Sequence, residues 1–102
     1  MMRTEQEIEK AKFEFVEARE NEWLDKAWDR IGRKLGFELE EWEERWKREK
    51  PVGPEFDIKR RFWYEARLEE LRNEAERQLE IQKKRWRQEF DEEFGEEEEE
   101  SQ

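Results

Sequence analysis

The stretch Lys50-Pro51-Val52-Gly53-Pro54 divides this sequence of 102 residues into two halves of similar length. Pro51 disfavours helical backbone at the residue before it, and Gly53-Pro54 continues the interruption. The stretch therefore predicts a turn that ends one helix and precedes another. We expect it to act as a Pro/Gly hinge between two helical motifs.

The composition predicts one helical domain with a thin core that is rich in aromatic rings. Charged residues make up 53% of the chain and apolar residues only 32%, which is low for a globular domain. Six Trp, seven Phe and one Tyr offset this shortage, because each ring buries a large area. The length suffices for one domain with one modest core, which we place in residues 1–95.

The net charge of −10 is concentrated towards the C-terminus. Residues 89–100 contain nine acids and no base, and the acids of the remaining chain nearly balance its 22 Lys and Arg. A nearly neutral body disfavours nucleic acid as a partner. Residues 96–102 are expected to form a disordered acidic tail.

The first motif is predicted at about residues 4–50. Thr4-Glu5-Gln6-Glu7 has the pattern of a capping box and predicts a helix start. Apolar residues then recur at helical spacing, but Gly32 and Gly36 interrupt the sequence of good helix formers. We expect a break near Gly36, followed by a shorter second helix over residues 37–49.

The second motif is predicted at about residues 54–94. Its helix should begin between Glu55 and Asp57, with Asp57 as a possible N-cap. The sequence contains no Gly or Pro between Pro54 and Gly95, which permits one long helix. Helices average only about 11–12 residues, so a turn near residues 81–84 stays open as an alternative.

The two halves correspond to each other at an offset of 48 positions. Glu17-Ala18-Arg19 falls on Glu65-Ala66-Arg67, and aromatic residues coincide at Phe15/Trp63, Trp42/Phe90 and Trp46/Phe94. Self-similarity at a fixed offset is typical of a duplicated supersecondary unit. The predicted fold is therefore all-α, with two tandem, sequence-divergent helix–turn–helix-like motifs that are related by an internal pseudo-repeat.

The sequence favours a protein that is not an enzyme. It contains no His and no Cys, its single Thr lies at the predicted helix cap, and its single Ser lies in the predicted tail. Nucleophilic and imidazole-based catalysis therefore have no candidate residues. Carboxylates on helices are most often a solvated face, so we predict no catalytic, cofactor-binding or metal-binding residues.

The surplus of aromatic residues indicates a protein–protein interaction module. Trp and Tyr are enriched at recognition surfaces, and a groove between two helical motifs could bind a peptide or a helix. An ordinary core of rings is the competing interpretation. The predicted groove residues are Trp23, Trp42, Trp46, Trp63, Trp86, Phe90 and Phe94.

Two further hypotheses remain open. Basic residues flank aromatic ones at residues 59–63 and 83–87, a pattern that can bind nucleic acid through backbone contacts and base stacking. The apolar face from Tyr64 to Leu79 could instead support homo-oligomerisation, so a monomer and a homodimer are both compatible with the sequence. No apolar run approaches the ~18 residues of a membrane span, and we expect a soluble protein inside a cell.

The segment Gly36-Phe37-Glu38-Leu39-Glu40-Glu41-Trp42-Glu43-Glu44-Arg45-Trp46, the central break and the acidic end together resemble a small protein of the lipothrixviruses, filamentous viruses of the hyperthermophilic archaeon Acidianus. The resemblance implies a heat-stable viral protein in the host cytoplasm, with a host or viral protein as its partner. It leaves association with the virion open, and it assigns no catalytic or binding residue. The abundance of Glu, Lys and Arg agrees with a hot environment.

Overall fold

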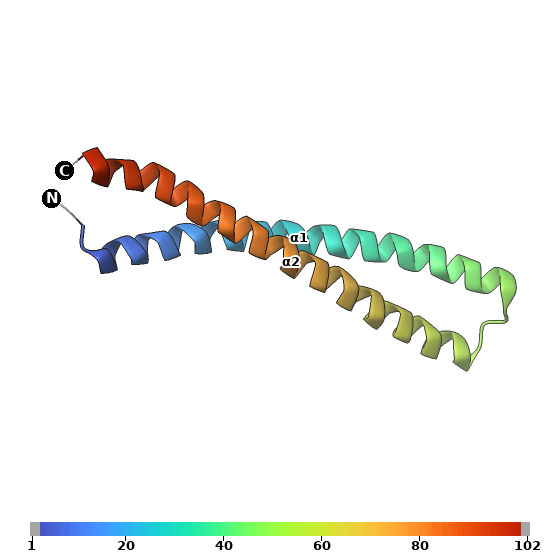
Figure 1. The fold of residues 1–102 in the computed structure, drawn as a ribbon. Coiled ribbons are helices and arrows are strands. Elements are labelled where there is room, and N and C mark those ends of the chain that lie inside the picture. Colours follow the sequence, from blue (N-terminus) through green and yellow to red (C-terminus); the bar gives the residue numbers. More distant parts are fainter. Residues whose placement is uncertain (1–2, 101–102) are drawn as a thin grey trace. The chain divides into compact units, whose positions relative to one another are not determined.

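The computed structural model describes the backbone of residues 3–100 and the side chains of residues 3–94. These residues form two α-helices, α1 (Glu5–Glu49) and α2 (Pro54–Glu100), and no strand (Figure 1). The prediction of an all-α fold is confirmed. Helix α2 runs to Glu100. The side chains of residues 95–100 and the whole of residues 101–102 lie outside the described residues. The disordered acidic tail at 96–102 therefore stays a prediction.

Local sequence signals explain where both helices begin. The Thr4 hydroxyl accepts a hydrogen bond from the Glu7 amide at 3.2 Å, as the capping box predicted. Helix α2 starts at Pro54, whose fixed φ suits the first helical position. The Phe56 amide donates to the Gly53 carbonyl at 3.0 Å. Asp57 therefore lies within the first turn, and the prediction that it caps the helix is wrong.

Helix α1 continues through both glycines, so the predicted break near Gly36 is wrong. Neither Gly32 nor Gly36 has a positive φ. A glycine inside a helix costs about 1 kcal/mol relative to alanine. Burial of Ile31 and Leu35, which are 9% and 3% exposed, contributes about 1.5–3 kcal/mol each. Packing therefore outweighs the low helix propensity.

Helix α2 likewise continues through residues 81–84, and the alternative of a turn there is wrong. Leu79 and Trp86 are seven residues apart, and both pack against Val16. Seven residues span two helical turns, so a continuous helix is needed to keep these side chains on one face. Each half of the chain is therefore one helix, without the internal turn of a helix–turn–helix motif.

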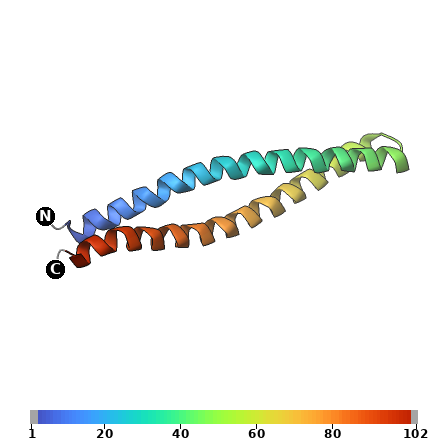
Figure 2. The same cartoon turned by 90° about the horizontal axis from the view of Figure 1, so that it is seen from above.

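The chain divides into two compact units, and each unit takes part of both helices. Unit 1 contains the residues up to Asp25 and those from Arg77 onwards, and unit 2 is Lys26–Glu76, which includes the loop 50–53. Inside each unit α1 and α2 are antiparallel (Figures 1 and 2). The ion pairs between the helices show this, because a residue further along α1 pairs with a residue earlier in α2.

Unit 1 has a small core of buried apolar residues, and two ion pairs also join its helices. Val16, Leu79 and Trp86 form the buried cluster, with Trp23 packed against it. Lys12 bonds Asp91 at 2.8 Å and Lys83 bonds Glu20 at 3.1 Å, both between α1 and α2. The rings of Phe15 and Phe90 meet edge to face at 5.5 Å.

Unit 2 has a core of aliphatic residues that continues into a cluster of rings. Ile31, Leu35 and Leu71 form the buried cluster, with Trp63, Leu68 and Ala75 packed against it. Arg67 and Glu38 pair between the helices, as do Arg60 and Glu43 at 2.6 Å. This unit thus combines apolar packing with charge pairs at its margins.

Contacts in the two units correspond at the offset of 48 positions. The ion pair Lys12–Asp91 in unit 1 corresponds to Arg60–Glu43 in unit 2. The ring pair Phe15–Phe90 corresponds in the same way to Trp63–Trp42. A duplicated helix that pairs with its own copy would produce this correspondence, and the internal repeat itself stays a prediction.

Candidate functional site

Four rings of unit 2 form a cluster next to the loop. Trp42 stacks on Trp46 at 5.4 Å and on Trp63 at 6.2 Å between ring centroids. Phe56, which is only 8% exposed, contacts both Trp42 and Trp46. We call these four residues the ring cluster. Trp42, Trp46 and Trp63 were predicted groove residues, and the structure brings these three together.

The loop is fastened to the ring cluster through Trp46. Its indole N–H donates to the Pro51 carbonyl at 3.4 Å, and the Lys50 ammonium lies 4.6 Å from its ring centroid. A cation over a ring face is attracted by the ring quadrupole. The residues that separate the helices therefore also hold one tryptophan of the cluster.

Two rings of the cluster line a hollow of about 280 Å³, which we call the ring hollow. Its walls come from both helices, and Trp42 and Trp63 are both half-buried. The charged groups around it are of both signs. The lining residues are Glu38, Glu41, Trp42, Arg45, Trp63 and Arg67.

A bidentate ion pair fixes one wall of the ring hollow. The Arg67 Nε donates to Glu38 at 2.6 Å and its Nη2 donates to the other carboxylate oxygen at 2.9 Å. The hydrogen bonds from Arg67 hold the pKa of Glu38 below its usual value, although desolvation acts in the opposite direction. The same bonds, together with one to Glu70, raise the pKa of Arg67.

The other predicted groove residues lie in unit 1, so the seven form two groups. Trp86 and Phe90 are 8% and 3% exposed, and Trp23 packs beside the cluster that contains Trp86. Phe94 stacks on Phe90 at 4.5 Å. Trp86 and Phe90 are therefore core residues, and Trp23 and Phe94 are half-buried beside them. The ring hollow in unit 2 leaves parts of two tryptophans accessible.

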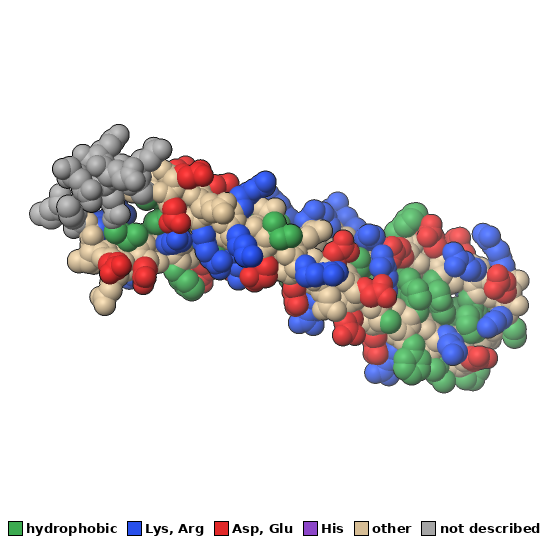
Figure 3. Space-filling view, viewed as in Figure 1, with side chains coloured by type: hydrophobic (Ala, Val, Ile, Leu, Met, Phe, Trp, Pro, Cys, Tyr) green, Lys and Arg blue, Asp and Glu red, His purple; other side chains and the backbone are tan. Residues whose placement is uncertain are grey.

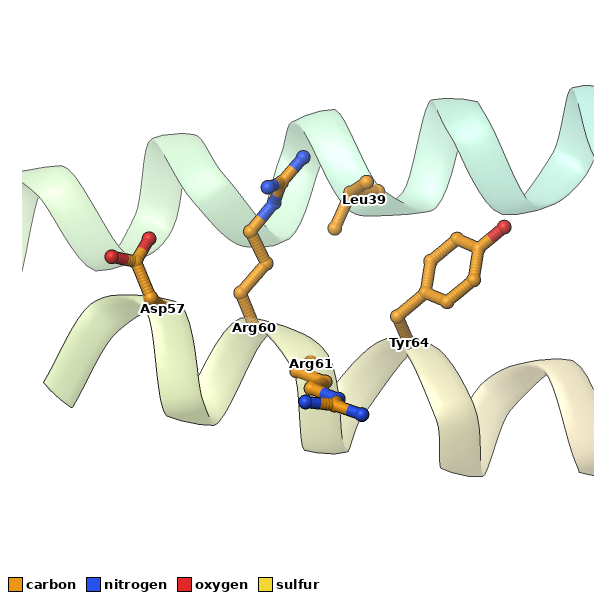
Figure 4. Close-up of a pocket in the computed structure, with 5 residues that line it drawn as sticks. All are labelled: Leu39, Asp57, Arg60, Arg61 and Tyr64. Atoms are coloured by element: carbon orange, nitrogen blue, oxygen red, sulfur yellow. The ribbon is translucent and has the colours of Figure 1, made fainter. Parts of the chain in front are cut away.

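Sequence reasoning missed a second hollow of about 330 Å³ on unit 2, which we call the seam pocket. Leu39 of α1 points towards α2, while the Tyr64 ring and the Arg60 side chain extend from α2 towards α1 (Figure 4). Asp57 and Arg61 complete its lining. The available signal was the helical spacing of Asp57, Arg61 and Tyr64, which places them along one side of α2.

Carboxylates pair with several of the basic residues that suggested nucleic-acid binding. Arg60 binds Glu43 at 2.6 Å, Arg61 binds Glu65 at 3.1 Å, and Lys83 binds Glu20 at 3.1 Å. Such pairing reduces the positive field that attracts phosphates. The structure therefore gives the nucleic-acid hypothesis no additional support.

Among the residues that the structure describes, no group of three or more potential ligands could hold a metal ion. None of the helical stretches that are described is long and apolar enough to cross a membrane. No family model, no curated protein and no solved structure matches this chain.

Proposed function

We propose that this protein is a non-enzymatic protein-interaction module that binds a helix or an extended peptide at the ring hollow. The carrying observation is that Trp42 and Trp63 come from different helices, stack at 6.2 Å and remain half-buried beside a hollow. If the chain is viral, as its resemblance implies, the partner is a host or viral protein in the host cytoplasm.

The lining of the ring hollow suggests how a partner would be held. Tryptophans in desolvated pockets contribute much of the binding energy of protein interfaces, so an apolar or aromatic side chain of the partner would pack on Trp42 and Trp63. Glu41 and Arg45 are exposed at the rim and can pair with partner charges of opposite sign. Rim charges act mainly on association rate and specificity.

The direct test is selection of binding peptides from a random library displayed on phage, with the full chain as the target. We expect the selected peptides to share an aromatic or large apolar residue, and to bind the variant Glu41→Lys with Arg45→Glu at least about tenfold more weakly. This exchange keeps the net charge and leaves the ring cluster intact.

The matched control exchanges Lys10→Glu with Glu14→Lys, another exposed pair four residues apart on α1. It should not change peptide binding. Peptides that bind the rim variant as tightly as the wild type would contradict the proposed site. A gel shift that weakens with salt and disappears in Lys83→Glu with Arg85→Glu would favour nucleic-acid binding instead.

A further inference from the structure

The seam pocket and the ring hollow lie on different sides of α1. Leu39 follows Glu38 by one residue, which turns it about 100° around the helix. Tyr64 remains 40% exposed beside Leu39, although the other large residues of its predicted apolar face, Leu68, Leu71 and Leu79, pack against α1. The seam pocket therefore belongs to a surface that the ring hollow does not use.

A comparison with unit 1 shows that the two helices can pair without an apolar surface on the side of the seam pocket. Along α1 the stripe through Leu39 contains Trp28, Gly32 and Gly36, at spacings of three and four residues. The positions 48 residues later along α2 contain Glu76, Glu80, Lys84 and Arg87, of which the last three lie in unit 1. Unit 1 pairs its helices with a charged stripe where unit 2 has an apolar and small one.

The apolar stripe is accessible in the structure. Trp28 is 46% exposed, and a Cβ placed on Gly32 or Gly36 would meet no atom within 4 Å. The space-filling view shows hydrophobic side chains gathered near the loop, between groups of both charges (Figure 3). Together with the seam pocket, this stripe forms what we call the seam face of unit 2.

We propose that the seam face binds the seam face of a second copy of this chain. In a two-fold arrangement whose axis is parallel to the helices, α1 of one copy lies antiparallel to α2 of the other. Leu39 then meets Tyr64 of the other copy at the register that Glu38–Arg67 and Glu43–Arg60 show within unit 2. The result is a bundle of four helices in which every neighbour is antiparallel.

The charges along the margins of the seam face are complementary in this arrangement. Four charges in order along α1 alternate in sign, and four in reverse order along α2 alternate with the opposite sign, while Glu44 and Glu65 lie between members of these two series. Each member of the α1 series therefore faces an opposite charge of the second copy. The α1 series is Asp29, Arg33, Glu40 and Lys47, and the α2 series is Arg72, Glu69, Arg61 and Asp57.

The contacts that these charges make within one chain would not prevent the exchange. Asp29–Arg33 and Arg61–Glu65 are i,i+4 pairs whose side chains are at least 60% exposed. Such exposed pairs contribute only about 0.3–0.5 kcal/mol. The association therefore covers Trp28, Leu39 and Tyr64 without breaking a strong interaction.

Sedimentation equilibrium of the full chain over a wide concentration range tests the proposal. We expect a monomer–dimer equilibrium, and Leu39→Arg should raise its dissociation constant at least about tenfold, since a charge would then face Tyr64. Arginine is the residue at the corresponding position of unit 1, Arg87, so the fold should tolerate it; circular dichroism checks this.

A charge exchange makes the test specific for the proposed arrangement. Lys47→Glu should weaken the dimer, and the addition of Asp57→Lys should restore it, because Lys47 of one copy faces Asp57 of the other. The control Ile81→Arg changes a 65% exposed residue of unit 1 and should leave the dimer unchanged. A chain that stays monomeric at all concentrations, or a dimer that Leu39→Arg does not weaken, overturns the proposal. Binding of a different protein to the seam face would then be the remaining alternative.

Discussion

At corresponding positions, unit 1 has an ion pair where unit 2 has two leucines. Glu20 and Lys83 meet at 3.1 Å in unit 1, with side chains 26% and 21% exposed. The positions related to them by the offset of 48 are Leu68 and Leu35, which belong to the apolar packing of unit 2. One helix-pairing scheme therefore accommodates either chemistry at the same place.

The two units also differ in how deeply they bury their aromatic rings. Unit 1 buries Phe90 to 3% exposure, whereas the corresponding Trp42 of unit 2 stays half-buried beside the ring hollow. Unit 1 thus buries Trp86 and Phe90, whereas unit 2 buries Phe56 and leaves parts of Trp42 and Trp63 accessible at the ring hollow. This contrast is why we place binding in unit 2.

The largest expected effect separates the two ring groups. Phe90→Ala should lower the free energy of unfolding by about 3–5 kcal/mol, because it leaves a cavity beside Phe15 and Phe94. Trp42→Ala should cost only about 2 kcal/mol, since water can enter from the ring hollow. Urea unfolding followed by circular dichroism measures both, and equal losses would remove the distinction between core and accessible rings.

An intermediate effect is expected when unit 1 receives the leucines of unit 2. Glu20→Leu with Lys83→Leu should raise the free energy of unfolding by about 1–2 kcal/mol, because a partly buried ion pair is often weaker than apolar packing. Lys83→Leu alone should destabilise the protein, since it leaves the Glu20 carboxylate without that partner. If the double variant is less stable than the wild type, the two chemistries are not interchangeable.

The smallest expected effect concerns the ion pair at the wall of the ring hollow. Glu38→Gln should lower the free energy of unfolding by about 1 kcal/mol near neutral pH. Because the folded-state pKa of Glu38 is lowered, its contribution is present above the ordinary pKa of a carboxyl group and is lost as the pH falls through the lowered value. The variant should lack this loss in acid.

The matched control for that ion pair is Glu65→Gln. Glu65 pairs with Arg61 on the exposed surface, with side chains 60% and 82% exposed. The expected loss is at most about 0.5 kcal/mol. A loss as large as that of Glu38→Gln would show that the interhelical position of Glu38 adds nothing.

The sequence predicted the helices better than it predicted their interruptions. The capping pattern at Thr4 and the break at residues 50–53 gave the all-α class and the boundaries of α1. Glycine propensity gave a break near Gly36 that does not occur, because propensity is a local quantity of about 1 kcal/mol and long-range packing exceeds it. Boundaries set by local chemistry were predictable, and those set by packing were not.

The candidate site was predictable only in part, for a similar reason. Helical spacing identified Trp42 and Trp46 as neighbours on one face, and they stack in the structure. It could not show that Trp63 joins them while Trp86 and Phe90 pack in another unit. Spacing along one helix does not determine the register between two helices, and contacts between side chains of different helices depend on that register.

The sequence by itself determined that this protein is helical, that residues 50–53 separate two helices, and that its rings lie on helical stripes. These properties follow from capping, from proline geometry and from a period of about 3.6 residues, which act within a few residues. Only the tertiary structure decided that α1 passes through both glycines and that each unit draws on both helices. It also decided which ring surface stays accessible, because antiparallel pairing brings together residues far apart in the chain, and the sum of their contacts outweighs local preference.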